Sequence, residues 1–267
     1  MWMQILIGAG LPAFGEAFPR KWGETIRDAN PAGFYESMLR TGIYHRTNPH
    51  PKTGAYFFPE QVERHVVKVF IPGLVRTDRA FIGSVVATIR PWREFEASLL
   101  RLYALEDEKH AEKRKPPRRM PPVLEWWAEN FQLLRDIATR RYRVHVQPYD
   151  ALLKDPEKVI ANVVDWLGQG DAAAAAAAVK PELRTQQSPE STSVEPEVAA
   201  VFDELYASVG RSEPVSARFL EKLNETNVVL APRVAEHQKA IIVERRRRVA
   251  LRGAPEQEHD PDDVPSW

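Results

Sequence analysis

Two side chains that could bind a phosphate follow a short apolar run. The run Ser84–Ile89 is nearly all apolar or β-branched, which is typical of a strand buried on both faces of a parallel sheet. Arg90 follows it directly, and Ser98 comes eight residues later in a predicted helix. Ligands of open α/β sheets bind at the carboxyl ends of strands, where a guanidinium can form paired hydrogen bonds with phosphate. The spacing alone also allows Arg90 to pair with a carboxylate and Ser98 to be a surface serine.

The surrounding pattern alternates between strands and helices. Val66–Phe70 is a second β-rich run, and the 13 residues before Ser84 could hold the short crossover helix that a parallel strand pair requires. Periodicity predicts further helices over 91–105, 123–139 and 155–167, a strand over 143–147, and C-terminal helices over 196–209, 214–230 and 232–252. This order predicts an α/β fold.

Three segments resemble the sulfotransferase family. Residues 89–98 (IRPWREFEAS) resemble the family segment in which a strand-end Arg and a Ser hold the 3′-phosphate of 3′-phosphoadenosine 5′-phosphosulfate (PAPS). Residues 149–168 resemble a family stretch that runs from Tyr-Glu-Asp-Leu through Asp-Pro to a helix ending in Phe-Leu-Gly. Residues 30–36 (NPAGFYE) match a turn common in bacterial members. The order and the distances agree over roughly residues 1–187.

The resemblance implies a fold and a reaction. The fold would be a P-loop-NTPase-like parallel sheet flanked by helices in residues 1–187, with a helical extension over 188–252; the composition of residues 253–267 predicts a disordered tail. The reaction would move a sulfuryl group from PAPS, as co-substrate, to a hydroxyl of a small-molecule, carbohydrate or lipid acceptor. Arg90 and Ser98 would bind the donor. Arg184 could be a further donor contact or an ordinary exposed arginine.

The start of the chain departs from the family pattern. Residues 1–12 resemble a family helix that follows a strand and a loop holding the 5′-phosphosulfate, and neither the strand nor the loop occurs in this sequence. Because backbone amides in such loops stabilise developing charge, their loss would be chemically severe. We therefore expect that the natural protein starts upstream and that Met1 is an internal methionine. The alternative is a degenerate binding or scaffold protein that does not bind the donor.

The general base is also different. Residues 68–72 (KVFIP) are similar to the Lys-Thr-His-Leu-Pro of cytosolic members, and Phe70 occupies the position of the histidine that deprotonates the acceptor. Glu36 is the first candidate for another base, with His45 and His65 as weaker ones, although Glu36 could be a surface carboxylate. Lys68 could stabilise charge on the bridging oxygen or simply pair with an acid.

Composition excludes several other classes. Lys+Arg and Asp+Glu number 37 each, so the net charge gives no support for a nucleic-acid or membrane-surface partner. The chain has no cysteine, which rules out disulfides and thiol catalysis and fits a reducing cytoplasm. No apolar stretch approaches the ~18 residues of a membrane span. No GxxxxGK[ST] motif occurs, which disfavours a nucleotide kinase. The expectation is a soluble cytoplasmic protein without a metal.

Three further features have two interpretations each. The charged, Pro-rich connector 106–122 includes Arg118 and Arg119, and it could form a mobile basic lid over the donor or a solvated charge run. The basic run Arg245–Arg248 could bind an acidic partner or form a solvated helix face. Trp126 and Trp127 are better explained by core packing than by stacking on a sugar.

Overall fold

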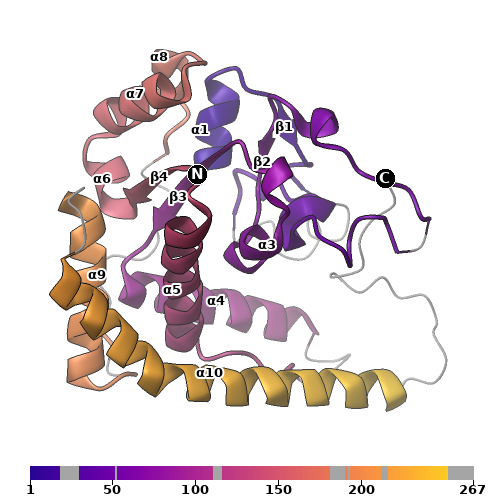
Figure 1. Cartoon of the computed structure of the whole chain (residues 1–267), viewed down its shortest axis with the longest axis vertical. Coiled ribbons are helices and arrows are strands. Elements are labelled where there is room, and N and C mark those ends of the chain that lie inside the picture. The colour runs from indigo at the N-terminus through magenta and orange to yellow at the C-terminus, as the bar shows by residue number, and fades with distance from the viewer. Residues whose placement is uncertain are drawn as a thin grey trace. The chain divides into compact units, whose positions relative to one another are not determined.

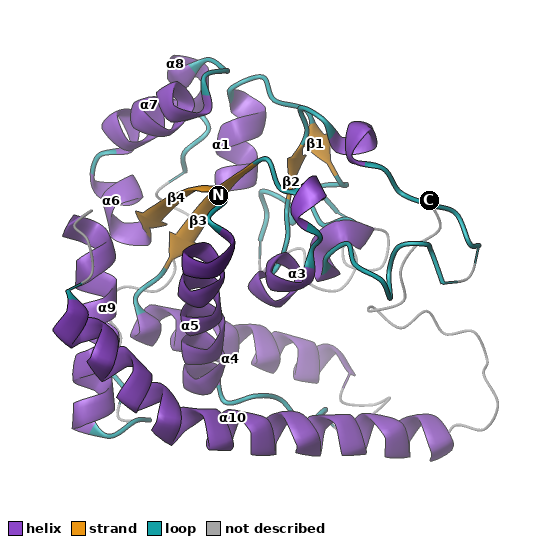
Figure 2. Ribbon diagram, in the orientation of Figure 1, coloured by secondary structure: helices purple, strands orange, loops and turns teal. Residues whose placement is uncertain are grey.

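The structure is a computed structural model that describes residues 1–18, 30–51, 53–110, 116–180, 190–191, 193–211 and 216–251. It is an α/β protein, mostly helical, with two small parallel sheets (Figures 1 and 2). The chain divides into two compact units, of which the first contains residues 1–90 and 132–185 and the second contains residues 91–131 and the C-terminal helices. The boundary expected near residue 187 rests on the family resemblance and stays a prediction.

The first unit holds both sheets. Its elements are α1 (Trp2–Gly8), β1 (Ala13–Phe14), η2 (Met38–Thr41), η3 (Pro59–Val62), β2 (Val66–Val67), α3 (Ile71–Arg76), η4 (Arg79–Phe81), β3 (Ser84–Ile89), the end of α5 (Pro122–Arg140), β4 (Arg143–Pro148), α6 (Tyr149–Lys154), α7 (Pro156–Leu167) and α8 (Ala172–Ala176). Strand β1 pairs with β2, and β3 pairs with β4 along its whole length, both in parallel.

The predicted pairing of the two β-rich runs with each other is wrong. In the described residues β2 pairs with β1 rather than with β3, so the strands form two separate sheets. Strand β2 also stops after two residues, because Phe70 caps a new helix and Pro72 lies in its first turn. Proline lacks the N–H that a sheet ladder needs. The P-loop-like arrangement of one continuous sheet therefore stays a prediction.

Local signals place helix α7 where the sequence predicts it. The Asp155 side chain accepts a hydrogen bond from the Lys158 N–H, Pro156 occupies the first turn, and Gly168 ends the helix in the left-handed region at φ 75°. The apolar side of α7 joins α1, α6 and α8 in a core of fully buried residues that includes Ile5, Leu152, Ile160 and Ala175. The alanine run of α8 thus serves close packing.

Helices are the only regular secondary structure in the described part of the second unit. It contains α4 (Trp92–His110), the first part of α5, α9 (Pro196–Arg211) and α10 (Ala217–Leu251). Its core is aromatic: the Phe202 ring lies 4.8 Å from the Trp126 ring and 5.3 Å from the Trp127 ring, centroid to centroid. Both tryptophans are almost fully buried, which confirms their packing role.

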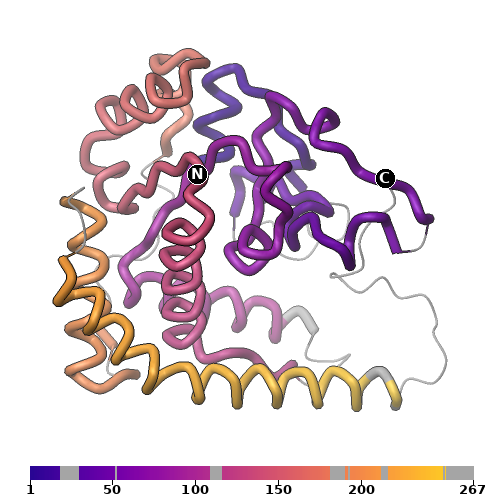
Figure 3. The backbone as a smooth tube through the Cα atoms, viewed as in Figure 1, coloured from indigo at the N-terminus to yellow at the C-terminus, as the bar shows by residue number. Residues whose placement is uncertain are grey.

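Helix α10 corrects the predicted break at Pro232. It runs for 35 residues, and Figure 3 shows its backbone as one continuous coil. Leu223, Leu230 and Val234 are buried and lie on one side of the helix, before and after the proline. Because the buried side chains continue on the same side of the helix past Pro232, their packing outweighs the single backbone hydrogen bond that proline removes. No helix in the described ranges is both long and apolar enough to cross a bilayer.

The connector before α5 is held in place where it is described. Arg119 donates to both oxygens of Asp107 at 2.8 Å and to Glu106 at 3.0 Å, and its guanidinium lies 4.3 Å from the ring centroid of Tyr103. The Arg118 backbone N–H donates to Glu244 of α10. These contacts hold Arg119 in place, and they therefore argue against the interpretation of this part of the connector as a mobile lid. The basic residues 113–115 lie outside the described residues.

Candidate functional site

Arg90 lies at the carboxyl edge of the β3–β4 pair, as the sequence predicts. Ile89 is opposite Pro148 in the parallel register, so the next residues, Arg90 and Tyr149, leave the two strands side by side. The Arg90 guanidinium lies 4.9 Å from the centroid of the Tyr149 ring. The structure thus brings together two of the three segments that resemble sulfotransferases. A ring below the guanidinium restricts the plane in which its N–H groups can donate.

The structure says less about the other two residues predicted to contact PAPS, Ser98 and Arg184. Ser98 lies in α4, partly exposed, in the second unit. Its joint role with Arg90 stays a prediction. Arg184 lies outside the described residues.

The predicted turn before Glu36 is present. The Asn30 side chain donates to the Gly33 carbonyl at 2.7 Å, and the Gly33 N–H donates back to the Asn30 carbonyl at 3.0 Å. Gly33 has φ 94°, and a β-carbon there would lie 2.9 Å from the Ala17 β-carbon, so only glycine fits. The Gln4 amide of α1 donates to the carbonyls of Ala32 and Gly33. Helix α1 therefore fixes the turn that leads into Glu36.

Glu36 and Lys68, the two predicted catalytic residues, form a direct ion pair. The Lys68 Nζ donates to Glu36 Oε1 at 2.8 Å, and the Arg40 Nε lies 3.7 Å from Glu36 Oε2. Glu36 is only 5% exposed, so the alternative of a surface carboxylate is wrong. A buried carboxylate requires such compensation. Of the two interpretations of Lys68, pairing with an acid is the one that the geometry shows directly.

Two aromatic rings lie close to Lys68. Its Nζ lies 5.8 Å from the centroid of the Phe34 ring and 5.5 Å from that of Phe70, the residue at the family's histidine position. Burial first, and then the charge of Lys68, lowers the pKa of the Met1 amino group to about 6. The weaker base candidates, His45 and His65, are both exposed.

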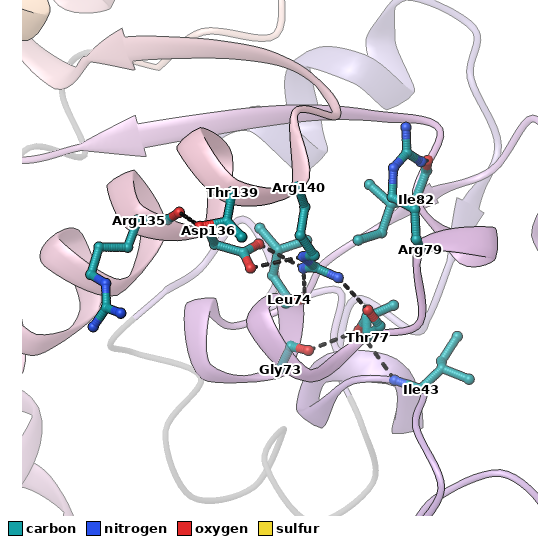
Figure 4. Close-up of polar contacts among 10 residues, drawn as sticks. All are labelled: Ile43, Gly73, Leu74, Thr77, Arg79, Ile82, Arg135, Asp136, Thr139 and Arg140. Atoms are coloured by element: carbon teal, nitrogen blue, oxygen red, sulfur yellow. Dashed lines mark hydrogen bonds and ion pairs between the residues drawn. The ribbon is translucent and has the colours of Figure 1, made fainter.

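A polar network at the end of α5 supports the elements that carry this ion pair (Figure 4). Arg140 donates to both oxygens of Asp136, at 2.8 and 2.6 Å, and to the carbonyls of Thr77 and Leu74 at 2.6 and 2.7 Å. Thr77 Oγ1 in turn donates to the Gly73 carbonyl and accepts from the Ile43 N–H. Arg140 thus donates to two carbonyls at the end of α3, of which that of Leu74 also accepts from the Thr77 N–H at 3.1 Å.

This network matters for Glu36 and Lys68 because α3 follows the Lys68 strand closely. Ile43, on the other side of the network, comes just after η2, which follows Glu36. Gly42 and Gly73 also pass at close range: a β-carbon on Gly42 would lie 2.2 Å from the Gly73 carbonyl oxygen. The two segments therefore pass so closely that neither glycine leaves room for a side chain.

Three contacts were not anticipated from the sequence. Arg40 lies four residues after Glu36 and Arg140 lies four residues after Asp136, and such i,i+4 charge pairs are a readable signal in helical segments. The contact of Tyr149 with Arg90 follows from the parallel register, which single-sequence patterns do not specify.

No group of three or more His, Asp or Glu side chains is arranged to hold a metal ion in the part of the chain that the structure describes. Comparisons of the chain with protein-family models, with curated proteins and with solved structures find no match in any of the three.

Proposed function

We propose that this chain is a sulfotransferase-type protein whose first unit binds the 3′-phosphate of PAPS through Arg90. One observation carries the proposal: a half-buried guanidinium, stacked on Tyr149, lies where two paired parallel strands end. That edge is where ligands of α/β sheets bind. A planar guanidinium suits the oxygens of a phosphate because it donates two parallel hydrogen bonds. Ser98 would add a third donor, as the family resemblance implies.

The reaction would use the Glu36–Lys68 pair. A hydroxyl of a small-molecule, carbohydrate or lipid acceptor would attack the sulfur of PAPS and lose its proton to the Glu36 carboxylate. The bond from sulfur to the bridging oxygen would break, and adenosine 3′,5′-bisphosphate would leave. Lys68 would donate to that bridging oxygen as it gains charge. The cytoplasm is the compartment in which we expect this reaction.

The test is binding of adenosine 3′,5′-bisphosphate to the 267-residue chain, measured as a shift of the melting temperature. Saturating bisphosphate should raise the melting temperature by several degrees. Arg90→Ala should weaken binding at least about tenfold, because a charge-assisted contact is lost. Arg46→Ala, a change of an exposed arginine in the same unit, is the matched control and should leave binding unchanged. Equal affinity of wild type and Arg90→Ala would refute the role of Arg90.

A second candidate is a non-catalytic binding or scaffold protein. The contact that favours it is the 2.8 Å Lys68–Glu36 pair, since two residues that neutralise each other can serve stability alone. The same titration separates the candidates. No stabilisation of the wild-type chain by the bisphosphate would favour the scaffold. Stabilisation that depends on Arg90 would favour the enzyme.

A further inference from the structure

Helix α10 presents a second, outward side that its own unit does not cover. We call the outer seam the residues that recur on this side with alternating spacings of four and three: Val228, Pro232, Ala235, Lys239, Ile242 and Arg246. All six are exposed, with Val228 at 74% and Ile242 at 50%. Spacing of this kind keeps one line of side chains directed at a partner helix. The neighbouring Val229 and Val243 are also exposed, at 60% and 57%.

The opposite side of α10 is already used. Leu223, Leu230 and Val234 are buried there, about half a turn away from the outer seam at 3.6 residues per turn. Isolated exposed apolar residues are ordinary on protein surfaces. Two adjacent pairs of large apolar residues, two heptads apart on one side of one helix, form a patterned surface.

Opposite charges flank the two apolar pairs on the same side, with exposed Arg218 as one basic residue ahead of the acidic ones. Glu221 and Glu225 precede the first apolar pair, and Arg245, Arg246 and Arg247 follow the second; all five are exposed. The acidic and basic ends cannot neutralise each other within one chain. Glu225 and Arg246 are separated by 21 residues of helix, or about 31 Å.

The pattern becomes complementary when a second copy of α10 runs in the opposite direction. A two-fold axis between Ala235 and Glu236 sets Glu225 against Arg246 of the other copy. The same axis sets Val228 against Val243 and Val229 against Ile242. Small Ala235 lies at the crossing, where the backbones must approach most closely. A single position of the two-fold axis therefore brings together both the apolar pairs and the opposite charges.

We propose that the outer seam binds a second copy of this chain, with the two α10 helices antiparallel. Such an interface is isologous, because the same surface serves both partners and each contact occurs twice. A parallel arrangement would set Glu225 against Glu225 and Arg246 against Arg246, which is repulsive. An acidic partner or an anionic surface would engage only the arginine end and leave Val228 and Val229 uncovered. The dimer does not depend on the proposed enzymatic function.

A charge exchange tests the dimer. Sedimentation of the full chain over a concentration series should show a monomer–dimer equilibrium. Glu225→Arg and Arg246→Glu should each raise the dissociation constant about tenfold or more, because each converts two attractions per dimer into repulsions. The double variant Glu225→Arg with Arg246→Glu should return to within about threefold of wild type, since the pairs are restored with exchanged signs.

The controls make each outcome decisive. Glu197→Arg makes the same change of charge at an exposed position on α9 and should leave the dissociation constant unchanged. Unfolding curves of all variants should agree within about 0.5 kcal/mol, as is usual for exposed sites. A wild-type chain that stays monomeric throughout overturns the proposal. So does a double variant that dimerises as weakly as the single ones.

Because the chain contains no cysteine, introduced thiols can report the direction of the helices. Val228→Cys protein mixed with Val243→Cys protein should give a cross-linked dimer on mild oxidation. Val228→Cys alone should not, since in an antiparallel pair its two copies lie about 22 Å apart, far beyond disulfide reach. Efficient cross-linking of Val228→Cys alone would show a parallel dimer and contradict the proposal.

Discussion

Removal of the Arg140 side chain should be the most damaging single change in the first unit. Asp136 is only 8% exposed, and Arg140 neutralises it with two hydrogen bonds while donating to the carbonyls of Leu74 and Thr77. Arg140→Ala leaves a buried carboxylate without its cation and takes one donor from each of the Leu74 and Thr77 carbonyls, of which that of Leu74 keeps the Thr77 N–H at 3.1 Å. Breaking a buried pair in this way costs about 3–5 kcal/mol, because the remaining charge has lost its solvent and its partner.

The assay is urea unfolding at constant temperature, with circular dichroism as the signal that monitors unfolding. Arg140→Ala should lower the free energy of unfolding by about 3–5 kcal/mol, and Arg140→Lys, which keeps the charge but loses the forked geometry, should lower it by less. Arg135→Ala is the control. Figure 4 shows that its side chain points away from the network, and it is exposed, so the change should stay within about 0.5 kcal/mol.

A double variant separates the ion pair from the general loss of a side chain. Arg140→Ala combined with Asp136→Ala removes both charges, and its cost should be clearly smaller than the summed costs of the two single changes. An Arg140→Ala protein as stable as the Arg135→Ala control would refute this reasoning. It would mean that water or another residue compensates Asp136.

Two predictions concern the second unit. Burial and the neighbouring Glu125 raise the pKa of Glu129 from an ordinary 4.5 to about 7, so the folded state holds this proton more tightly than the unfolded state. The contribution of Glu129 to the free energy of unfolding should therefore be largest below about pH 4.5, and it should fall by at most about 3 kcal/mol as the pH rises to 7. Glu129→Gln should remove this part of the pH dependence, measured by unfolding curves at several pH values. An unchanged dependence of the unfolding free energy on pH would contradict the assignment. Trp127→Ala should cost about 3–5 kcal/mol, because the ring is fully buried between Phe131 and Phe202, and a loss below 1 kcal/mol in urea unfolding would show that the core repacks.

Several elements were predictable because their signals are local. The run Ser84–Ile89 forms a strand with the predicted bounds, and α7 begins and ends at its proline and glycine signals. Arg90 lies at a strand end for the same reason. Periodicity, capping residues and turn chemistry act between near neighbours in the chain, so they can be read before anything is known of the partners.

Other features depend on which distant segments meet. The sequence did not reveal that β2 pairs with β1, that α10 continues through Pro232, or that Arg140 reaches the end of α3. In each case contacts far apart in the chain outweigh the local preference. A buried stripe on both sides of Pro232 can offset one lost hydrogen bond, but no local pattern announces that the stripe will be covered.

The sequence by itself determined the residue types of the candidate site: a strand-end arginine, a carboxylate after a glycine turn, and a lysine ahead of a proline. Only the tertiary structure decided that Glu36 is buried and bound to Lys68, and that Arg90 is stacked on Tyr149. The physical reason is that burial and pairing are properties of the solvent and neighbours around a group. These are set when the chain closes on itself, and they decide what charge and which contacts each side chain can use.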